Sequence, residues 1–176
     1  SQPGCSAIKD ASIIPRLVDM LNDTAAERLS ILVDVVHTIE SYLDFSQNEV
    51  STFRELNGVD TLSSRMRHEA LASLEEVKSA AEPERKRKAN SMELDGGGET
   101  SGRSTPGGGD SPNRVSYHRR VLLKALMRTL AYTSFAVGGS RTRIPGLADG
   151  TLTETLSIVL RNAQAFGPGV SSLAAN

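Results

Sequence analysis

The spacing of apolar residues is the feature that most constrains what this chain can fold into. From Leu29 to Leu43 they recur at intervals of three, four, three and four, which places them on one face of an α-helix. The pattern returns from Leu62 to Val77 and from Leu122 to Leu130. No segment of useful length alternates apolar and polar residues as a half-buried strand does. The sequence therefore predicts an all-α fold.

Helix starts are indicated by capping boxes, in which two side chains each bond the other's backbone N–H. The pairs are Thr24 with Glu27, Ser46 with Glu49, and Thr151 with Glu154. Helix ends are predicted at Gly58, with positive φ, at Gly138 and Gly139, and at Gly167 before Pro168. A short helix from Ile13 to Leu21 and the start of another at the C-terminus bring the expected number to five or six.

The helix expected from about Asp60 to Ala80 carries an apolar stripe and a charged face. The stripe consists of Leu62, Met66, Ala70, Leu74 and Val77. The charged residues are expected to point mainly outward: Arg65, Arg67, Glu69, Glu75, Glu76 and Lys78.

The order of these helices suits an armadillo-like α-solenoid, in which each helix pair buries its face against the next pair. A closed bundle is the alternative, because the sequence shows no visible repeat at a fixed period. One long interruption divides the chain. We expect helical repeats at 1–80, an insertion at 81–116, and at 117–176 further repeats of the same solenoid.

The interruption between Ala81 and Ser116 is rich in Gly, Pro, Ser and charge. From Glu82 to Arg114 it holds six cations and six anions, so its charges cancel. Such a segment buries too little apolar surface to offset the entropy of ordering, so we expect a long disordered insertion.

Within that insertion, four consecutive cations fit the pattern of a nuclear import signal, although a solvated tether is the more frequent role of such a run. They are Arg85, Lys86, Arg87 and Lys88. Thr105 and Ser111 each precede a proline and are candidate phosphorylation sites, where phosphate would add negative charge near the cations.

The residues that carry chemistry elsewhere do not form a recognisable catalytic, cofactor or metal site. His37, His68 and His118 fall on three different predicted helices without a second ligand type at metal spacing. Cys5 has no predicted base nearby. Arg141 and Arg143 lie in a predicted loop that could bind an anion, but an ordinary exposed connection is favoured. We expect no cofactor.

Composition narrows the partners. The 20 Lys and Arg residues nearly balance 21 Asp and Glu, so the field is weak and nucleic acid is disfavoured. No apolar run approaches the roughly 20 residues that cross a bilayer, and we expect no membrane partner. The single cysteine favours an intracellular location, in the cytoplasm, the nucleus or both. Both ends look cut from a longer protein.

Two blocks of the sequence resemble a known family. They are "FRELNGVDTLSSRMRHE", Phe53 to Glu69, and "RRVLLKALMRTLAYTSF" followed by "GLADGTLTETLSIVLRNAQAFGPGVSSLAAN". About half of the chain is covered, in the right order. Together the blocks resemble the N-terminal armadillo-like region of the giant HECT-type ubiquitin ligases, the group that includes animal Mule and the large plant ubiquitin-protein ligases.

The resemblance implies a function for the parent protein. Such ligases transfer ubiquitin from a conjugating enzyme to substrate lysines through a cysteine thioester in a C-terminal HECT domain, which is absent from this sequence. Cys5 matches no part of that domain's motif. This segment would be a non-catalytic scaffold that contacts protein substrates and the rest of the ligase chain, while the conjugating enzyme binds only the HECT domain. A free-standing helical adaptor unrelated to ubiquitin is the alternative.

Overall fold

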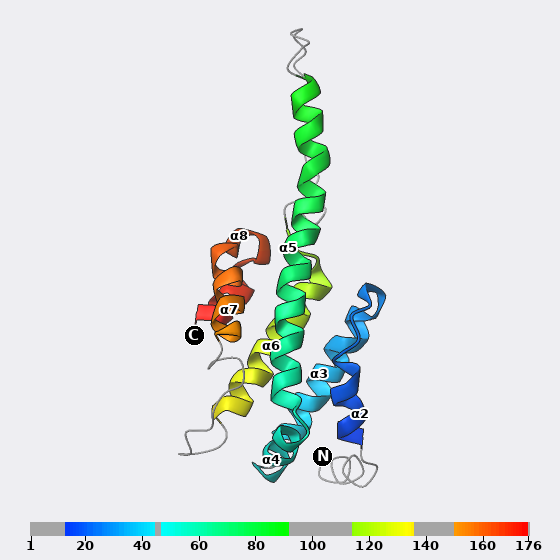
Figure 1. The fold of residues 1–176 in the computed structure, drawn as a ribbon, viewed down its shortest axis with the longest axis vertical. Coiled ribbons are helices and arrows are strands. Elements are labelled where there is room, and N and C mark those ends of the chain that lie inside the picture. Colours follow the sequence, from blue (N-terminus) through cyan, green and yellow to red (C-terminus); the bar gives the residue numbers. More distant parts are fainter. Residues whose placement is uncertain (1–12, 45–46, 92–113, 136–149, 176) are drawn as a thin grey trace, which may run out of the picture.

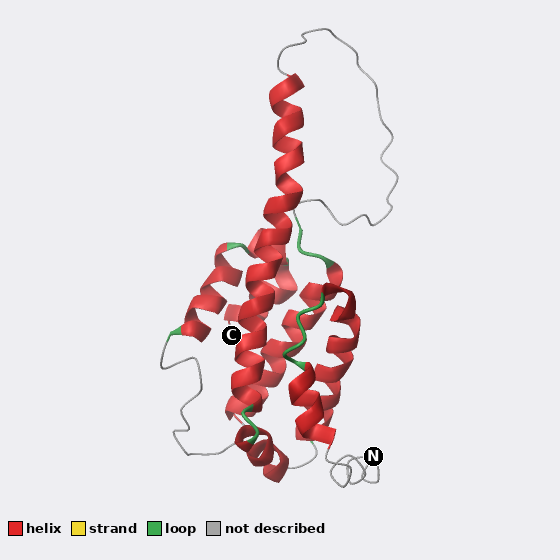
Figure 2. Ribbon diagram, turned by 45° about the vertical axis from the view of Figure 1, so that its right-hand side comes forward, coloured by secondary structure: helices red, strands yellow, loops and turns green. Residues whose placement is uncertain are grey.

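The computed structural model describes residues 13–44, 47–91, 114–135 and 150–175, and within these ranges the chain is helical without any strand (Figures 1 and 2). The elements in chain order are α2 (Ile13–Met20), the 3-10 turn η1 (Ala26–Arg28), α3 (Leu29–Leu43), α4 (Gln47–Glu55), α5 (Gly58–Ser91), α6 (Tyr117–Phe135), α7 (Thr151–Arg161), α8 (Ala163–Phe166) and α9 (Pro168–Ala175). The all-α prediction is confirmed for these ranges.

Helix α6 is the centre of the packing. It contacts α3, α5 and α9, while α5 also packs against α4 and α7 (Figure 1). The apolar stripes predicted from the sequence supply the interior, which includes the fully buried Leu62, Met66, Leu122 and Leu126. Burying one such side chain contributes about 1.5–3 kcal/mol. The helices that meet here therefore come from both sides of the predicted insertion.

Helix α5 continues beyond the boundary predicted at Ala81, through Pro83, and ends at Ser91. Its last turns stand clear of the packed helices in both views (Figures 1 and 2). Residues 114–116 also have defined structure, and Val115 is fully buried. Of the segment expected to be an insertion, only 92–113 lies outside the described residues.

Two capping-box predictions are wrong. The N-cap of η1 is Ala25 and that of α7 is Gly150, and neither helix start has a side-chain cap. Asp23 rather than Thr24 accepts the N–H of Ala25, at 3.0 Å. Gly150 adopts the left-handed conformation with φ of 79°, which makes Thr151 the first helical residue. The third pair involves Ser46, which lies outside the described residues.

Gly58 is not the left-handed residue that ends a helix, as the sequence suggested. Asn57 takes that role with φ of 57°, and Gly58 is the first residue of α5. Asparagine tolerates this conformation better than most residues because its short side chain bonds locally. What restricts position 58 is space, because a Cβ there would overlap the Phe53 ring.

The C-terminal elements follow the sequence more closely. Gly167 ends α8 with φ of 80°, and the expected last helix is α9. The single helix predicted before Gly167 is divided at Asn162, whose φ of -111° ends α7. Predictions at Cys5, Thr105, Ser111, Gly138, Gly139, Arg141 and Arg143 lie outside the described residues.

Candidate functional site

The main polar feature of the interior is an ion pair on α5. Both of its side chains were predicted from the sequence to point outward. Arg65 and Glu69 are buried, with side chains 2% and 0% exposed. Their charged atoms, Arg65 Nη2 and Glu69 Oε1, lie 2.5 Å apart. The expectation that these two side chains point outward is wrong, because α5 is covered by other helices on more than its apolar stripe. Arg67 and Glu75 are partly or largely exposed, as predicted.

Arg65 also holds the loop that follows α2. Its Nη1 donates to the backbone carbonyls of Asp23 and, at 3.4 Å, of Leu21. These carbonyls follow the end of a helix and lack intrahelical partners, so the guanidinium satisfies backbone acceptors as well as a carboxylate. One side chain thereby joins α5 to the N-terminal part of the chain.

Arg119 of α6 completes the cluster. Its Nη1 binds Glu69 Oε2 at 2.5 Å, and its Nε binds Glu76 Oε2 at 2.9 Å. Glu76 also accepts the Ser116 N–H at 3.2 Å and the Ser116 hydroxyl at 3.4 Å. We call Arg65, Glu69, Glu76 and Arg119 the ion network.

The charges of the ion network cancel, since two guanidinium groups face two carboxylates. Removing Glu69 would leave the buried Arg65 without its carboxylate partner, and breaking a buried pair in this way typically costs about 3–5 kcal/mol. The arrangement favours one packing of α5 on α6, because Arg119 of α6 has to reach both Glu69 and Glu76 of α5. Its chemistry is structural: both carboxylates accept hydrogen bonds from fixed donors, which suits neither for proton transfer.

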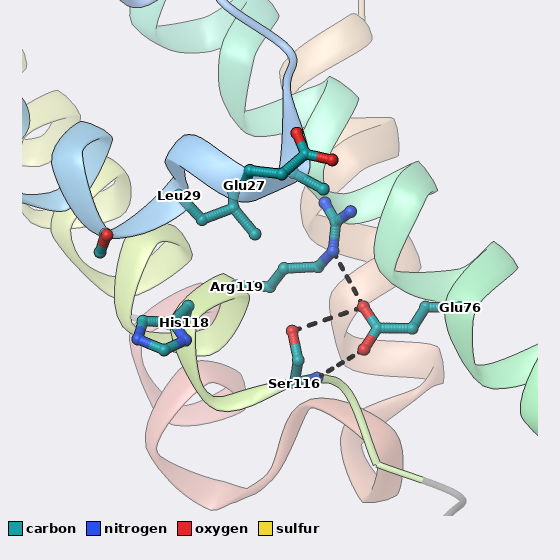
Figure 3. A pocket seen from close by; sticks show the side chains of 8 residues that line it. Glu27, Leu29, Glu76, Ser116, His118 and Arg119 are labelled. Carbon is teal, nitrogen blue, oxygen red and sulfur yellow. Dashed lines mark hydrogen bonds and ion pairs between the residues drawn. The ribbon is translucent and has the colours of Figure 1, made fainter.

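A pocket of about 390 Å³ lies beside the ion network (Figure 3). Glu76, Ser116 and Arg119 form one wall, and the residues around η1, including Glu27 and Leu29, form the other. Figure 3 shows the Arg119 side chain directed toward Glu76 and His118 set apart from that pair. Because Arg119 already binds the carboxylates of Glu69 and Glu76, the pocket offers a ligand little unsatisfied charge.

Further polar contacts tie the remaining helices together. The Tyr42 hydroxyl of α3 donates to Glu49 of α4, and Arg54 of α4 donates to the Thr133 carbonyl of α6. Arg67 of α5 pairs with Glu154 of α7 at 3.2 Å. Glu49 and Glu154, expected as capping residues, thus bind across helix interfaces. The sequence does not distinguish the two roles, because a capping box and an acid that binds a neighbouring helix both place a Glu near the start of a helix.

The structure does not bring the three histidines together. His37, His68 and His118 lie on α3, α5 and α6. His68 Nδ1 is 3.6 Å from Glu69 Oε1, and His37 Nε2 is 3.4 Å from Arg128 Nη2. Among the described residues, no cluster of three or more His, Cys, Asp and Glu side chains could hold a metal ion. None of the helices over the same ranges is both long and apolar enough to cross a membrane.

One contact of the ion network could be predicted from the sequence. The i,i+4 spacing of Arg65 and Glu69 is visible and indicates a pair on one helix. Nothing local shows that the pair is buried or that Arg119, fifty positions away, joins it. That contact depends on the packing of α5 on α6.

The fold and the ion network define an all-helical domain whose main buried polar site is structural. Residues 33–176 match the model of a family described as Domain of Unknown Function (DUF913), and the chain belongs to that family. It is 34% identical over 175 residues to E3 ubiquitin-protein ligases UPL1 and UPL2 of Arabidopsis thaliana. The predicted resemblance to the large plant ubiquitin-protein ligases is thereby confirmed.

The match covers 99% of this chain but only 4% of each ligase. No solved structure matches the chain. The similarity therefore concerns one small segment of each relative.

Proposed function

We propose that this chain is a non-catalytic scaffold segment of a HECT-type ubiquitin ligase that helps to recruit protein substrates. The observation that carries the proposal is the similarity of nearly the whole chain to a segment of two E3 ubiquitin-protein ligases. The ion network supports a structural role, because its charged groups hold helices in place.

The packing order supports the armadillo-like arrangement within this proposal. Helix α6 contacts both α3 and α9, which come three labels before and after it. Rows of equivalent helices are what a repeat of three helices produces, whereas a closed bundle brings its first and last helices together. The scaffold is then a short piece of superhelix with exposed faces for protein partners.

The test separates catalysis from recruitment in the full-length parent protein. A deletion of residues 13–175 should leave ubiquitin thioester formation on the HECT cysteine unchanged. Ubiquitination of a protein substrate should fall, because the segment that recruits the substrate is gone. Equal loss of both would contradict a recruiting role. If the parent reading frame ends without a HECT domain, the free-standing adaptor is the better description.

We also propose that the low-complexity segment predicted at 81–116 carries a nuclear import signal. Arg85, Lys86, Arg87 and Lys88 fall in the part of α5 that stands beyond the packed helices (Figure 1). Replacing the four with alanine should lower the nuclear fraction of the chain when it is fused to a reporter too large to diffuse through pores. Thr105→Glu with Ser111→Glu should lower it in the same direction, because added negative charge offsets the cations. Unchanged distribution in both variants would remove the proposal.

A further inference from the structure

A second hollow in the molecule differs from the pocket beside the ion network because its cations are unsatisfied. It measures about 600 Å³ and lies where α5 meets the junction of α7 and α8. Its polar lining consists of Arg114, Arg161, Asn162 and Gln164, and Val77 with two alanines forms the apolar remainder. None of these lining residues is acidic, so nothing in the wall balances the two guanidinium charges.

The two arginines lack any hydrogen-bond or ion-pair partner within the described part of the chain. Most other arginines of the packed helices do have such partners. Arginines that bind a carboxylate or a backbone carbonyl are Arg28, Arg54, Arg65, Arg67, Arg119 and Arg128. Arg114 and Arg161 are exposed, and their donors are free to bind a group from outside.

The backbone that carries both arginines is fixed. The Val115 N–H donates to the Ala165 carbonyl at 3.1 Å, and the Val115 side chain is fully buried, so the chain beside Arg114 is held against α8. Arg161 is the last residue of α7, and the following Asn162 binds back to the Ile158 carbonyl at 2.8 Å. A site on fixed backbone loses less entropy when it binds a ligand.

We propose that this hollow binds a phosphorylated serine or threonine side chain of a partner peptide. Two guanidinium groups in a wall that contains no acid match a phosphate, which carries close to two negative charges and three acceptor oxygens. A single carboxylate would leave one of the two cations unbalanced. Gln164 adds an amide to the lining, and Val77 adds an apolar side chain.

This inference extends the proposed function by naming a class of partner, and it rests on the scaffold role for its biological meaning. Its test, however, measures binding to the chain of 176 residues alone. A negative result here would leave the thioester and recruitment experiment on the full-length protein unaffected.

The probe is a fluorescein-labelled degenerate peptide pool with a central phosphoserine, compared with pools that carry serine or glutamate at the same position. Fluorescence anisotropy should show binding of the phosphoserine pool, competition by inorganic phosphate, and weaker binding as salt rises. Arg114→Gln and Arg161→Gln should each weaken binding about tenfold, the loss expected for one charge-assisted hydrogen bond. Arg16→Gln is the matched control, because Arg16 is exposed on α2 and also lacks a described partner.

Each result of the binding experiment either supports the site or overturns it. Loss of binding in both hollow variants, with native binding in the Arg16 variant and unchanged circular dichroism in all three, supports the site. No binding of the phosphoserine pool overturns the proposal, as does binding that is insensitive to both substitutions. A glutamate pool that binds as tightly as the phosphoserine pool overturns the assignment of phosphate.

Discussion

At the scale of single residues, Gly58 shows how one missing Cβ permits a helix to start. Alanine at this position would overlap the Phe53 ring, and Phe53 is itself fully buried. We expect Gly58→Ala to lower the free energy of unfolding by about 1–3 kcal/mol, the usual cost of overpacking. Urea denaturation followed by circular dichroism measures the change.

The matched control for that substitution is Gly169→Ala in α9. A Cβ there would meet only the flexible end of the Lys124 side chain, which can move aside. Alanine is also the better helix former, so the control should be neutral or slightly stabilising. If both variants unfold at the same urea concentration as the unsubstituted chain, the close approach of Phe53 does not constrain position 58.

Glu69 is the member of the ion network whose loss should cost most. It is fully buried and binds both Arg65 and Arg119, so Glu69→Gln leaves two cations facing a neutral amide. We expect the free energy of unfolding to fall by about 3 kcal/mol. Glu75→Gln, which removes an exposed pair with Lys78, should change it by less than about 1 kcal/mol. Equal effects in a urea titration would show that burial does not set the contribution of Glu69.

Residue roles were predictable from the sequence where the signal is local. The apolar spacing from Leu29 to Leu43 predicted one buried helix face, and Leu32, Val36, Ile39 and Leu43 are buried. Gly167 was expected to end a helix and does so with positive φ. Glu69 was expected to face solvent and is buried, because whether an acid is covered depends on which helix packs over it.

At the scale of elements, α5 combines a packed part and a projecting part. Its fully buried side chains lie between Leu62 and Ser73, and its last contact with the ion network is at Glu76. The insertion boundary was predicted at Ala81 because Gly, Pro, Ser and charged residues concentrate between Ala81 and Ser116. The backbone nevertheless remains helical to Ser91.

A deletion of residues 84–112 tests whether the projecting part contributes to the fold. The rise of 1.5 Å per residue places Pro83 only about 10 Å beyond Glu76, a gap that the residues before Ser116 can span. We expect circular dichroism to lose only the helical signal of 84–91 and the unfolding midpoint in urea to stay unchanged. A much larger loss of helical signal would show that this segment stabilises the packed helices.

At the scale of the whole molecule, the contacts of α6 with α3 and α9 show why local patterns predicted the elements but not their arrangement. In each helix, apolar residues spaced three and four apart predict which face is buried. The pairing of these faces depends on contacts between residues far apart in the sequence. An example is the contact of α3 with α6, which lie on opposite sides of the insertion. The sequence has no visible repeat period that would have predicted these contacts.

The proposed open superhelix predicts that this chain associates with itself in isolation. Several large apolar side chains are exposed at the surface, including Ile31 at 49%, Leu71 at 44% and Leu160 at 42%. In a solenoid, faces at the two ends of a segment pack against neighbouring repeats, so an isolated segment leaves apolar surface in water. We expect sedimentation velocity to show a weight-average mass that rises with concentration above the monomer mass of 18.8 kDa. A constant monomer mass together with a sharp unfolding transition at high temperature would indicate a self-contained domain, and the proposal of an open superhelix would then be wrong.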